Sequence, residues 1–247
     1  MKNKTGKVRK VLIAAAAAVA VFFCAAFLLL YFGVVHLNAP DEEAYPVRGV
    51  DVSHHQGKID WETLSSQGVS FAFIKATEGS SYVDPRFEEN RAAATATGLR
   101  VGAYHFFSFD STGEAQAKLF CGTVGDAQNM LPPVIDVEFY GKYKSGKGVD
   151  FPRVKKELRA LVDILTDEYG VKPVIYADKD TYEAIVKGDF SDCGLWYRSV
   201  YSAVPDTIGW TFWQYSNRHV LKGYDGGRYI DMNVFYGDAV EFEKYPD

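Results

Sequence analysis

An uncharged stretch of 25 residues, from Val11 to Val35, most constrains what this chain can fold into. A helix of that length crosses a bilayer core of about 30 Å, because each residue adds about 1.5 Å. A cleaved signal peptide normally has an apolar core of only about 7–15 residues, so an uncleaved anchor is favoured over cleavage near Cys24 and over a buried core helix. Basic residues precede the stretch and acids at 41–43 follow it, which predicts a cytoplasmic N-terminus.

The uncharged stretch divides the chain into four expected parts. Residues 1–10 form a basic cytoplasmic segment, 11–35 a transmembrane signal anchor, 36–46 a linker and 47–247 one outer domain. The whole chain has 27 basic and 32 acidic residues, of which five basic and three acidic ones precede residue 47. The outer domain therefore has 22 basic and 29 acidic residues and a net charge of −7. Nucleic-acid binders are normally basic, so a nucleic-acid partner is excluded.

Short β-type runs alternate with helical stretches throughout the outer domain. The expected strands cover residues 47–53, 70–76, 100–107, 133–138, 173–177, 195–197, 211–215 and 229–231, and the expected helices cover 60–64, 84–98, 112–120, 150–169 and 179–186. The first helix is capped by Asp60, and the second begins with Asp84 as N-cap before Pro85. Five strand–helix units followed by three strands predict an α/β barrel of TIM type with an incomplete ring of helices.

Two acids end the fourth expected strand, in the segment Val134-Ile135-Asp136-Val137-Glu138. Successive side chains of a strand alternate between its faces, so Asp136 and Glu138 point to the side of Val134, while Ile135 and Val137 face the other layer. The Asp-x-Glu spacings at 41–43 and 60–62 lack this strand context. Two neighbouring carboxyls perturb each other's proton affinity, which suits acid–base work on a glycosidic bond.

Two further acids are expected at the same end of the barrel. Asp51 ends the first expected strand and Asp231 the last. Each alone has the ordinary alternative of capping a turn. Four acids at one rim are not explained by stability, since clustered like charges repel, and the ends of barrel strands are where catalytic groups lie.

Histidine and cysteine give weaker signals. A metal site built on His54, His55 and His105 is disfavoured, because adjacent histidines on a strand point to opposite faces; we expect no metal and no cofactor. Cys121 and Cys193 either form a disulfide or remain free thiols, because the sequence does not show whether they are close.

Several segments together resemble a known family, in the family's own order. They are 48–57 (RGVDVSHHQG), 71–79 (FAFIKATEG), 102–106 (GAYHF), 136–138 (DVE), 213–215 (WQY) and 230–233 (IDMN). These blocks resemble glycoside hydrolase family 25, the muramidase-type lysozymes. The resemblance implies an irregular (β/α)5β3 barrel at 47–247. Together with the predicted transmembrane helix before it, which is not part of the family's domain, this places the expected catalytic domain on the outside of a bacterial cell membrane.

The resemblance also implies an activity and a set of residues. The expected reaction is hydrolysis of the β-1,4 bond between N-acetylmuramic acid and N-acetylglucosamine in peptidoglycan. By position, Glu138 is the general acid/base, Asp136 its assisting partner, and Asp51 and Asp231 the other active-site acids. Aromatic rings suit sugar faces but also fill cores. The expected substrate-binding residues are Tyr104, His105, Trp196, Tyr197, Trp213 and Tyr215.

The mechanism and two competing functions are left open by the sequence. A second carboxylate either acts on the oxocarbenium-like centre or orients the substrate's N-acetyl group, and we favour the orienting role for Asp136, because it shares a strand with Glu138. The alternatives to a muramidase are a non-catalytic peptidoglycan-binding module and a metal-dependent amidase or deacetylase. We expect a monomer.

Overall fold

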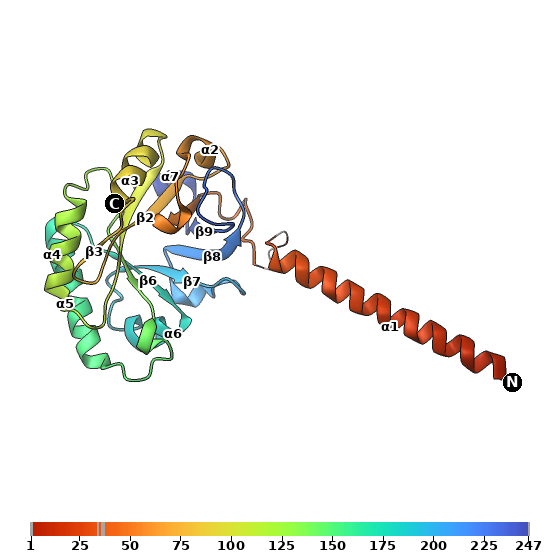
Figure 1. The fold of residues 1–247 in the computed structure, drawn as a ribbon. Helices are drawn as coiled ribbons and strands as arrows, with labels where there is room; N and C mark the ends of the chain where they lie inside the picture. The colour runs from red at the N-terminus through yellow and green to blue at the C-terminus, as the bar shows by residue number, and fades with distance from the viewer. Residues whose placement is uncertain (1, 34, 36–37, 247) are drawn as a thin grey trace. The chain divides into compact units, whose positions relative to one another are not determined.

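The computed structural model describes residues 2–33, 35 and 38–246, and the chain divides into two compact units, residues 1–37 and 38–247. The first unit contains helix α1 (Lys2–Tyr31), drawn in red in Figure 1. Among the described residues, its segment Gly6–Tyr31 alone is long and apolar enough to cross a membrane, a property that signal sequences share. Positions 34, 36 and 37, part of the predicted anchor and linker, lie outside the described residues.

The second unit is built on a closed eight-stranded barrel. Its strands are β1 (Arg48–Val52), β2 (Phe71–Glu78), β4 (Arg100–Phe106), β5 (Val134–Val137), β6 (Val174–Asp178), β7 (Gly194–Arg198), β8 (Phe212–His219) and β9 (Ile230–Phe235). Pairing of β1 with β2 closes the barrel, and all neighbours are parallel except β9, which is antiparallel to both β8 and β1. The predicted barrel is confirmed, and a short extra strand, β3 (Tyr82–Val83), pairs with the end of β2.

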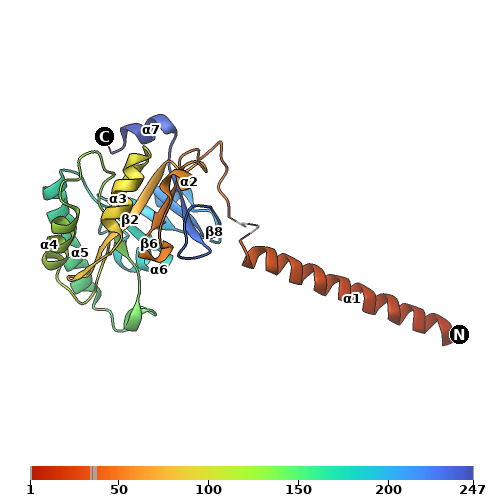
Figure 2. The same cartoon turned by 45° about the horizontal axis from the view of Figure 1, so that its top comes forward.

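Helices cover the outside of the barrel wall. They are α2 (Trp61–Ser65), α3 (Phe87–Ala96), α4 (Gly113–Val124), α5 (Phe151–Tyr169) and α6 (Lys179–Thr181), which continues as the π-helical turn Tyr182–Val186. Helix α7 (Ala239–Lys244) differs, because its Phe242 packs against Phe71 and Phe235 in the apolar cluster inside the barrel. Figures 1 and 2 both show α4 beside α5 and α3 against β2. Helix α5 follows its prediction closely: Asp150 accepts the Arg153 N–H at its start, and Gly170 ends it in a left-handed conformation with a φ of 70°.

Helix α3 begins later than predicted. Asp84 does not cap it; the helix starts at Phe87, and Arg86 is the residue before it. The Asp84 carboxylate instead accepts the backbone N–H groups of His54 and Arg86 at 3.1 and 3.0 Å. A distant segment of the chain therefore competes for the carboxylate that the local sequence assigns to the helix.

Large aromatic side chains fill the interior of the barrel. Phe71, Phe73 and Phe212 are fully buried there, with ring centroids 5.0–5.6 Å apart. Glycine makes room for them, since a Cβ on Gly102 would lie 2.5 Å from the Phe73 ring. The aromatic layer, defined by these three rings and Trp196, closes the interior of the barrel below the strand ends that carry the predicted acids.

The predicted linker is partly packed on the second unit. The Asn38 side chain donates hydrogen bonds to the carbonyls of Ser199 and Ser202 at 2.7 and 2.9 Å. The Tyr45 ring lies 5.4 Å from the ring of Trp210. The described part of the linker, residues 38–46, is thus fixed against the loop after β7.

Candidate active site

The barrel brings the four predicted acids to one rim. Asp51 lies near the end of β1, Asp136 lies in β5, and Glu138 follows β5 directly. Asp231 is the second residue of β9 and not the end of the last strand as predicted. It reaches the same rim because β9 runs antiparallel, which pairs Asp231 directly with Asp51. We name these four residues the acid cluster.

The faces of β5 are as predicted. Val134 packs inside the barrel with the aromatic layer, whereas Ile135 and Val137 pack with the core between the sheet and the helices. Asp136 shares the inner face with Val134, and its Oδ1 atom is buried without a hydrogen-bond partner among the described residues. A buried acceptor of this kind is available to a donor on a ligand.

Buried amides hold Asp51 in place. The Oδ2 atom of Asp51 accepts hydrogen bonds from Asn233 Nδ2 at 2.8 Å and Gln214 Nε2 at 2.9 Å. Gln214 Nε2 also lies 3.4 Å from Asp231 Oδ2, and the Oε1 atom of Gln214 accepts a hydrogen bond from the Tyr176 hydroxyl at 2.9 Å. These bonds fix the orientation of a carboxylate that neighbouring acids would otherwise repel.

Burial raises the proton affinity of the acid cluster. It raises the pKa of Asp136 and Asp231 well above the ordinary range of a carboxyl, with further increases from the charges of Glu138 and Asp51 respectively. It also raises the pKa of Glu138 and of Asp51, and the amide donors to Asp51 oppose that rise. Desolvation is the largest cause for each, so some of these carboxyls keep a proton above the pH at which solvated acids lose theirs.

Two cations border the acids. The Lys75 Nζ atom lies 2.6 Å from Glu78 Oε2 and 5.0 Å from the centre of the Phe106 ring, and its charge lowers the pKa of Asp136. Arg198, the last residue of β7, opposes the rise in the pKa of Glu138. Sequence reasoning singled out neither residue.

The predicted substrate-binding residues divide between the two faces of the barrel wall. Tyr104 faces the acids: burial and the charges of Asp51 and Asp136 raise its pKa well above that of a free phenol. Trp196 also faces inward, but it is covered, and its Nε1 atom donates to Asn233 Oδ1 at 2.8 Å. Trp196 therefore supports the acid cluster indirectly, through Asn233, which binds Asp51.

The other four lie on the opposite face, so the expectation that they contact substrate is wrong. His105 is fully buried between β4 and α4, with Nδ1 2.7 Å from the Thr77 hydroxyl and Nε2 3.0 Å from Gln116 Oε1. Tyr197, Trp213 and Tyr215 pack in the core between the sheet and the outer elements. The physical reason is strand alternation, since Trp196 and Gln214 point inward and their neighbours therefore point outward. These neighbours are Tyr197, Trp213 and Tyr215.

The histidines after β1 also differ from their prediction. His54 and His55 lie in a 3-10 turn, not on a strand, and their ring centres are 4.0 Å apart. His54 Nδ1 lies 2.7 Å from Asp84 Oδ2. Among the described residues, no group of three or more His, Cys, Asp and Glu side chains is arranged to hold a metal ion. Cys121 and Cys193 are free thiols.

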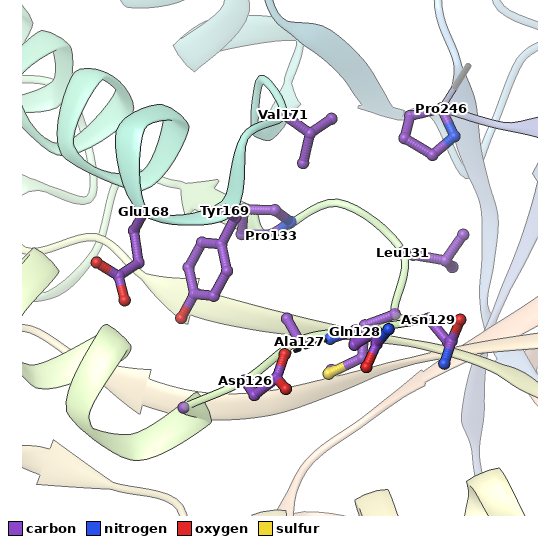
Figure 3. A pocket seen from close by; sticks show the side chains of 12 residues that line it. Asp126, Ala127, Gln128, Asn129, Leu131, Pro133, Glu168, Tyr169, Val171 and Pro246 are labelled. Atoms are coloured by element: carbon purple, nitrogen blue, oxygen red, sulfur yellow. Dashed lines mark hydrogen bonds between the residues drawn. The ribbon is translucent and has the colours of Figure 1, made fainter.

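A cavity of about 710 Å³ lies at the other end of β5 from the acids. Figure 3 shows Glu168 and Tyr169, from the end of α5, facing the segment after α4 that carries Asp126 and Ala127. Pro133, immediately before β5, also lines it. Catalytic groups of such barrels gather at the carboxyl ends of the strands, so the chemistry belongs to the opposite rim.

The most informative residues that sequence reasoning missed are the buried amides Gln214 and Asn233. A signal for both is present in the sequence. Gln214 is the one polar residue between the aromatic pair Trp213 and Tyr215, and Asn233 follows Asp231 by two positions on the same strand. Because side chains alternate between the two faces of a strand, this spacing predicts that both amides lie on the same face as the acids.

Comparison with known proteins agrees with this geometry. The profile of "Glycosyl hydrolases family 25" matches residues 50–224. A family 25 glycosyl hydrolase structure from Bacillus anthracis superimposes with a TM-score of 0.80 at 45% identity, covering 86% of this chain and 98% of that one. Lysozyme M1 of Streptomyces globisporus is 33% identical (78% of this chain, 69% of that protein), and the N,O-diacetylmuramidase of Chalaropsis sp. is 31% identical (72% and 91%). This chain belongs to glycosyl hydrolase family 25.

Proposed function

We propose that this protein is a muramidase that hydrolyses the β-1,4 bond between N-acetylmuramic acid and N-acetylglucosamine in peptidoglycan. The acid cluster carries the proposal. Three separate strands supply four carboxyls to one rim, and their burial raises every pKa in the set. The printed names of its lysozyme and muramidase relatives support the choice of this glycosidic bond.

Glu138 is the proposed proton donor. It follows the end of β5, one step nearer the rim than Asp136, and its side chain is only partly buried. Departure of the leaving sugar requires a proton at the glycosidic oxygen, and a carboxyl with a raised pKa still carries one near neutral pH. Glu138 then accepts a proton from the attacking water in the second half of the reaction.

Asp136 is the proposed orienting residue. Its buried Oδ1 atom has no partner among the described residues, so it offers an acceptor to the N–H of the substrate's N-acetyl group. A hydrogen bond there would direct the acetyl oxygen toward the anomeric carbon, which is the substrate-assisted variant of glycoside hydrolysis. Asp51 and Asp231 complete the charged rim. A product of inverted anomeric configuration would exclude this role.

The first unit is proposed to act as an uncleaved anchor. Helix α1 is uncharged and apolar from Val11 on, over a membrane-spanning length, and the basic residues lie in its first turns, before that stretch. This order favours a cytoplasmic N-terminus and an outer catalytic domain. Mass spectrometry of the protein from membranes tests this. An N-terminus beginning after residue 24 would show that the helix is a cleaved signal.

Wall hydrolysis by the detergent-solubilised full chain tests the activity. Purified peptidoglycan should release new reducing ends on muramic acid, identified by borohydride reduction before hydrolysis and sugar analysis. Glu138→Gln keeps the shape of the side chain but removes the transferable proton, so turnover should fall at least about 10²-fold. Glu43→Gln, at an exposed acid before the barrel, is the matched control and should leave turnover unchanged. Equal turnover by wild type and Glu138→Gln would refute the assignment.

A further inference from the structure

Arg198 occupies an inward position at the rim that the proposed chemistry does not use. It ends β7, two residues after the inward-facing Trp196, and strand alternation gives both side chains the same face. In the register of the sheet it lies between Asp178 of β6 and Gln214 of β8. Gln214 is the amide that contacts Asp51, so Arg198 borders the acid cluster directly.

The guanidinium of Arg198 makes no hydrogen bond or salt bridge with the described residues. Among residues 38–246, no carboxylate oxygen lies within 4.0 Å of it and no hydrogen bond engages it. The neighbouring carboxylate of Asp178 is used elsewhere, because its Oδ1 accepts from the backbone N–H and the hydroxyl of Thr181 at 2.9 and 3.0 Å. Lys75, the other cation at the rim, is already paired with Glu78. A half-buried arginine fork without an acceptor is suited to an anionic ligand.

A cavity of about 210 Å³ lies beside Arg198. Lys179 contributes a second positive charge to it, and the ring of Tyr201, which is 83% exposed, stands on the loop after β7. The two acids that line it are Asp178, already hydrogen-bonded to Thr181, and the exposed Asp180. The same loop is fixed from behind by Asn38, which binds the carbonyls of Ser199 and Ser202.

An anion can approach this cavity although four carboxyls lie nearby. Burial raises the pKa of all four acids, so the rim carries less negative charge near neutral pH than the number of carboxyls implies. The charge of Arg198 also lowers the pKa of Glu138, Asp51 and Asp231, as expected of a cation beside the acid cluster.

We propose that Arg198, assisted by Lys179, forms a carboxylate-binding subsite beside the acid cluster and gives the enzyme a preference for glycans that carry a lactyl or peptide carboxylate over neutral N-acetylglucosamine chains. The inference rests on the proposed function, because it assigns a substituent of the same glycan to a neighbouring cavity. A planar guanidinium binds a carboxylate through two parallel hydrogen bonds, a geometry that lysine cannot reproduce.

Binding to full-length protein in detergent separates this subsite from the chemistry. Glu138→Gln serves as the background so that no ligand is consumed, and calorimetry compares a peptide-free muramic-acid tetrasaccharide, its lactyl methyl ester and the N-acetylglucosamine tetramer. In this background Arg198→Gln should weaken binding of the free acid about tenfold, and that of the ester and the neutral tetramer less than about twofold. Arg198→Lys should give an intermediate loss, and Arg153→Gln, at an exposed arginine of α5, none.

A muropeptide probe, in which the lactyl group is amidated, distinguishes the two sources of the carboxylate. A loss confined to the free lactyl acid assigns the subsite to the lactyl group, and a loss confined to the muropeptide assigns it to the peptide. Equal weakening of all probes, or no weakening of any, overturns the subsite. Wall hydrolysis by wild type and Glu138→Gln is measured separately, so a failed subsite with intact hydrolysis leaves the proposed function standing.

Discussion

Replacing Asn233 with leucine should weaken both the fold and the acid cluster. Asn233 is fully buried; it donates to Asp51 Oδ2 at 2.8 Å and accepts from Trp196 Nε1 at 2.8 Å. Leucine has a similar size but neither polar atom. The lost bond to a carboxylate is worth about 1.5–3 kcal/mol, and an unsatisfied indole N–H costs about 1–3 kcal/mol more. We therefore expect Asn233→Leu to lower the free energy of unfolding by about 2.5–6 kcal/mol.

A double-mutant cycle separates the two contributions. In a Trp196→Phe background the indole N–H is already absent, so Asn233→Leu should cost about 1–3 kcal/mol less there than in wild type. Urea unfolding followed by circular dichroism measures each variant. Asn217→Leu, at a half-buried position of β8, is the control and should change stability by less than about 0.5 kcal/mol.

If Asn233→Leu lowers stability by less than about 1 kcal/mol, or costs the same with and without the indole N–H, the two bonds do not form the buried network described. Wall hydrolysis gives a second readout. Loss of the Asn233 donor should raise the pKa of Asp51 further, because that donor opposes the effect of burial, and activity should shift toward higher pH.

Two further substitutions test the packing of the barrel wall. Gly102→Ala places a Cβ 2.5 Å from the Phe73 ring and should lower the free energy of unfolding by about 1–3 kcal/mol in a urea titration, whereas Gly122→Ala, in helix α4 with nothing within 4 Å, should raise it by about 0.5–1 kcal/mol. Burial lowers the pKa of His105 from 6.5 in the unfolded chain to about 4, so its contribution to stability is fully present above pH 6.5 and is lost as the pH falls toward 4. Between pH 7 and pH 4 the free energy of unfolding of the wild type should therefore fall by up to about 3 kcal/mol more than that of His105→Gln. Equal decreases would show that His105 is not held in its neutral form by burial.

The fold was largely predictable because its signals are local. Each strand is a short apolar run, and helix α5 has both a cap at Asp150 and a stop at Gly170. The acids could be placed at one rim because the ends of barrel strands meet there. The start of α3 could not be predicted, since Asp84 is recruited by His54, which is 30 residues away in sequence.

The faces of the last strands were the hardest part to predict. In an ordinary strand one face is apolar and the other is solvated, which sets the phase of the alternation. Here both faces of β7 and β8 are buried, one in the aromatic layer and one under the outer elements, so Trp196, Trp213 and Tyr215 look alike in sequence. The polar residues Gln214 and Arg198 mark the inward phase of these two strands, whereas their aromatic neighbours do not.

The aromatic layer links the stability of this barrel to its chemistry. Phe71, Phe73 and Phe212 close the interior directly beneath the acids, which removes water from their inner side. The desolvation that results is the largest cause of the raised pKa of Asp136 and Glu138, so the packed core creates the proton affinity on which the proposed reaction depends. A raised carboxyl pKa also means that ionising these acids opposes folding as the pH rises through the folded-state values. The rim therefore weakens the fold at neutral pH, and the same aromatic packing that imposes this penalty supplies the apolar burial that offsets it.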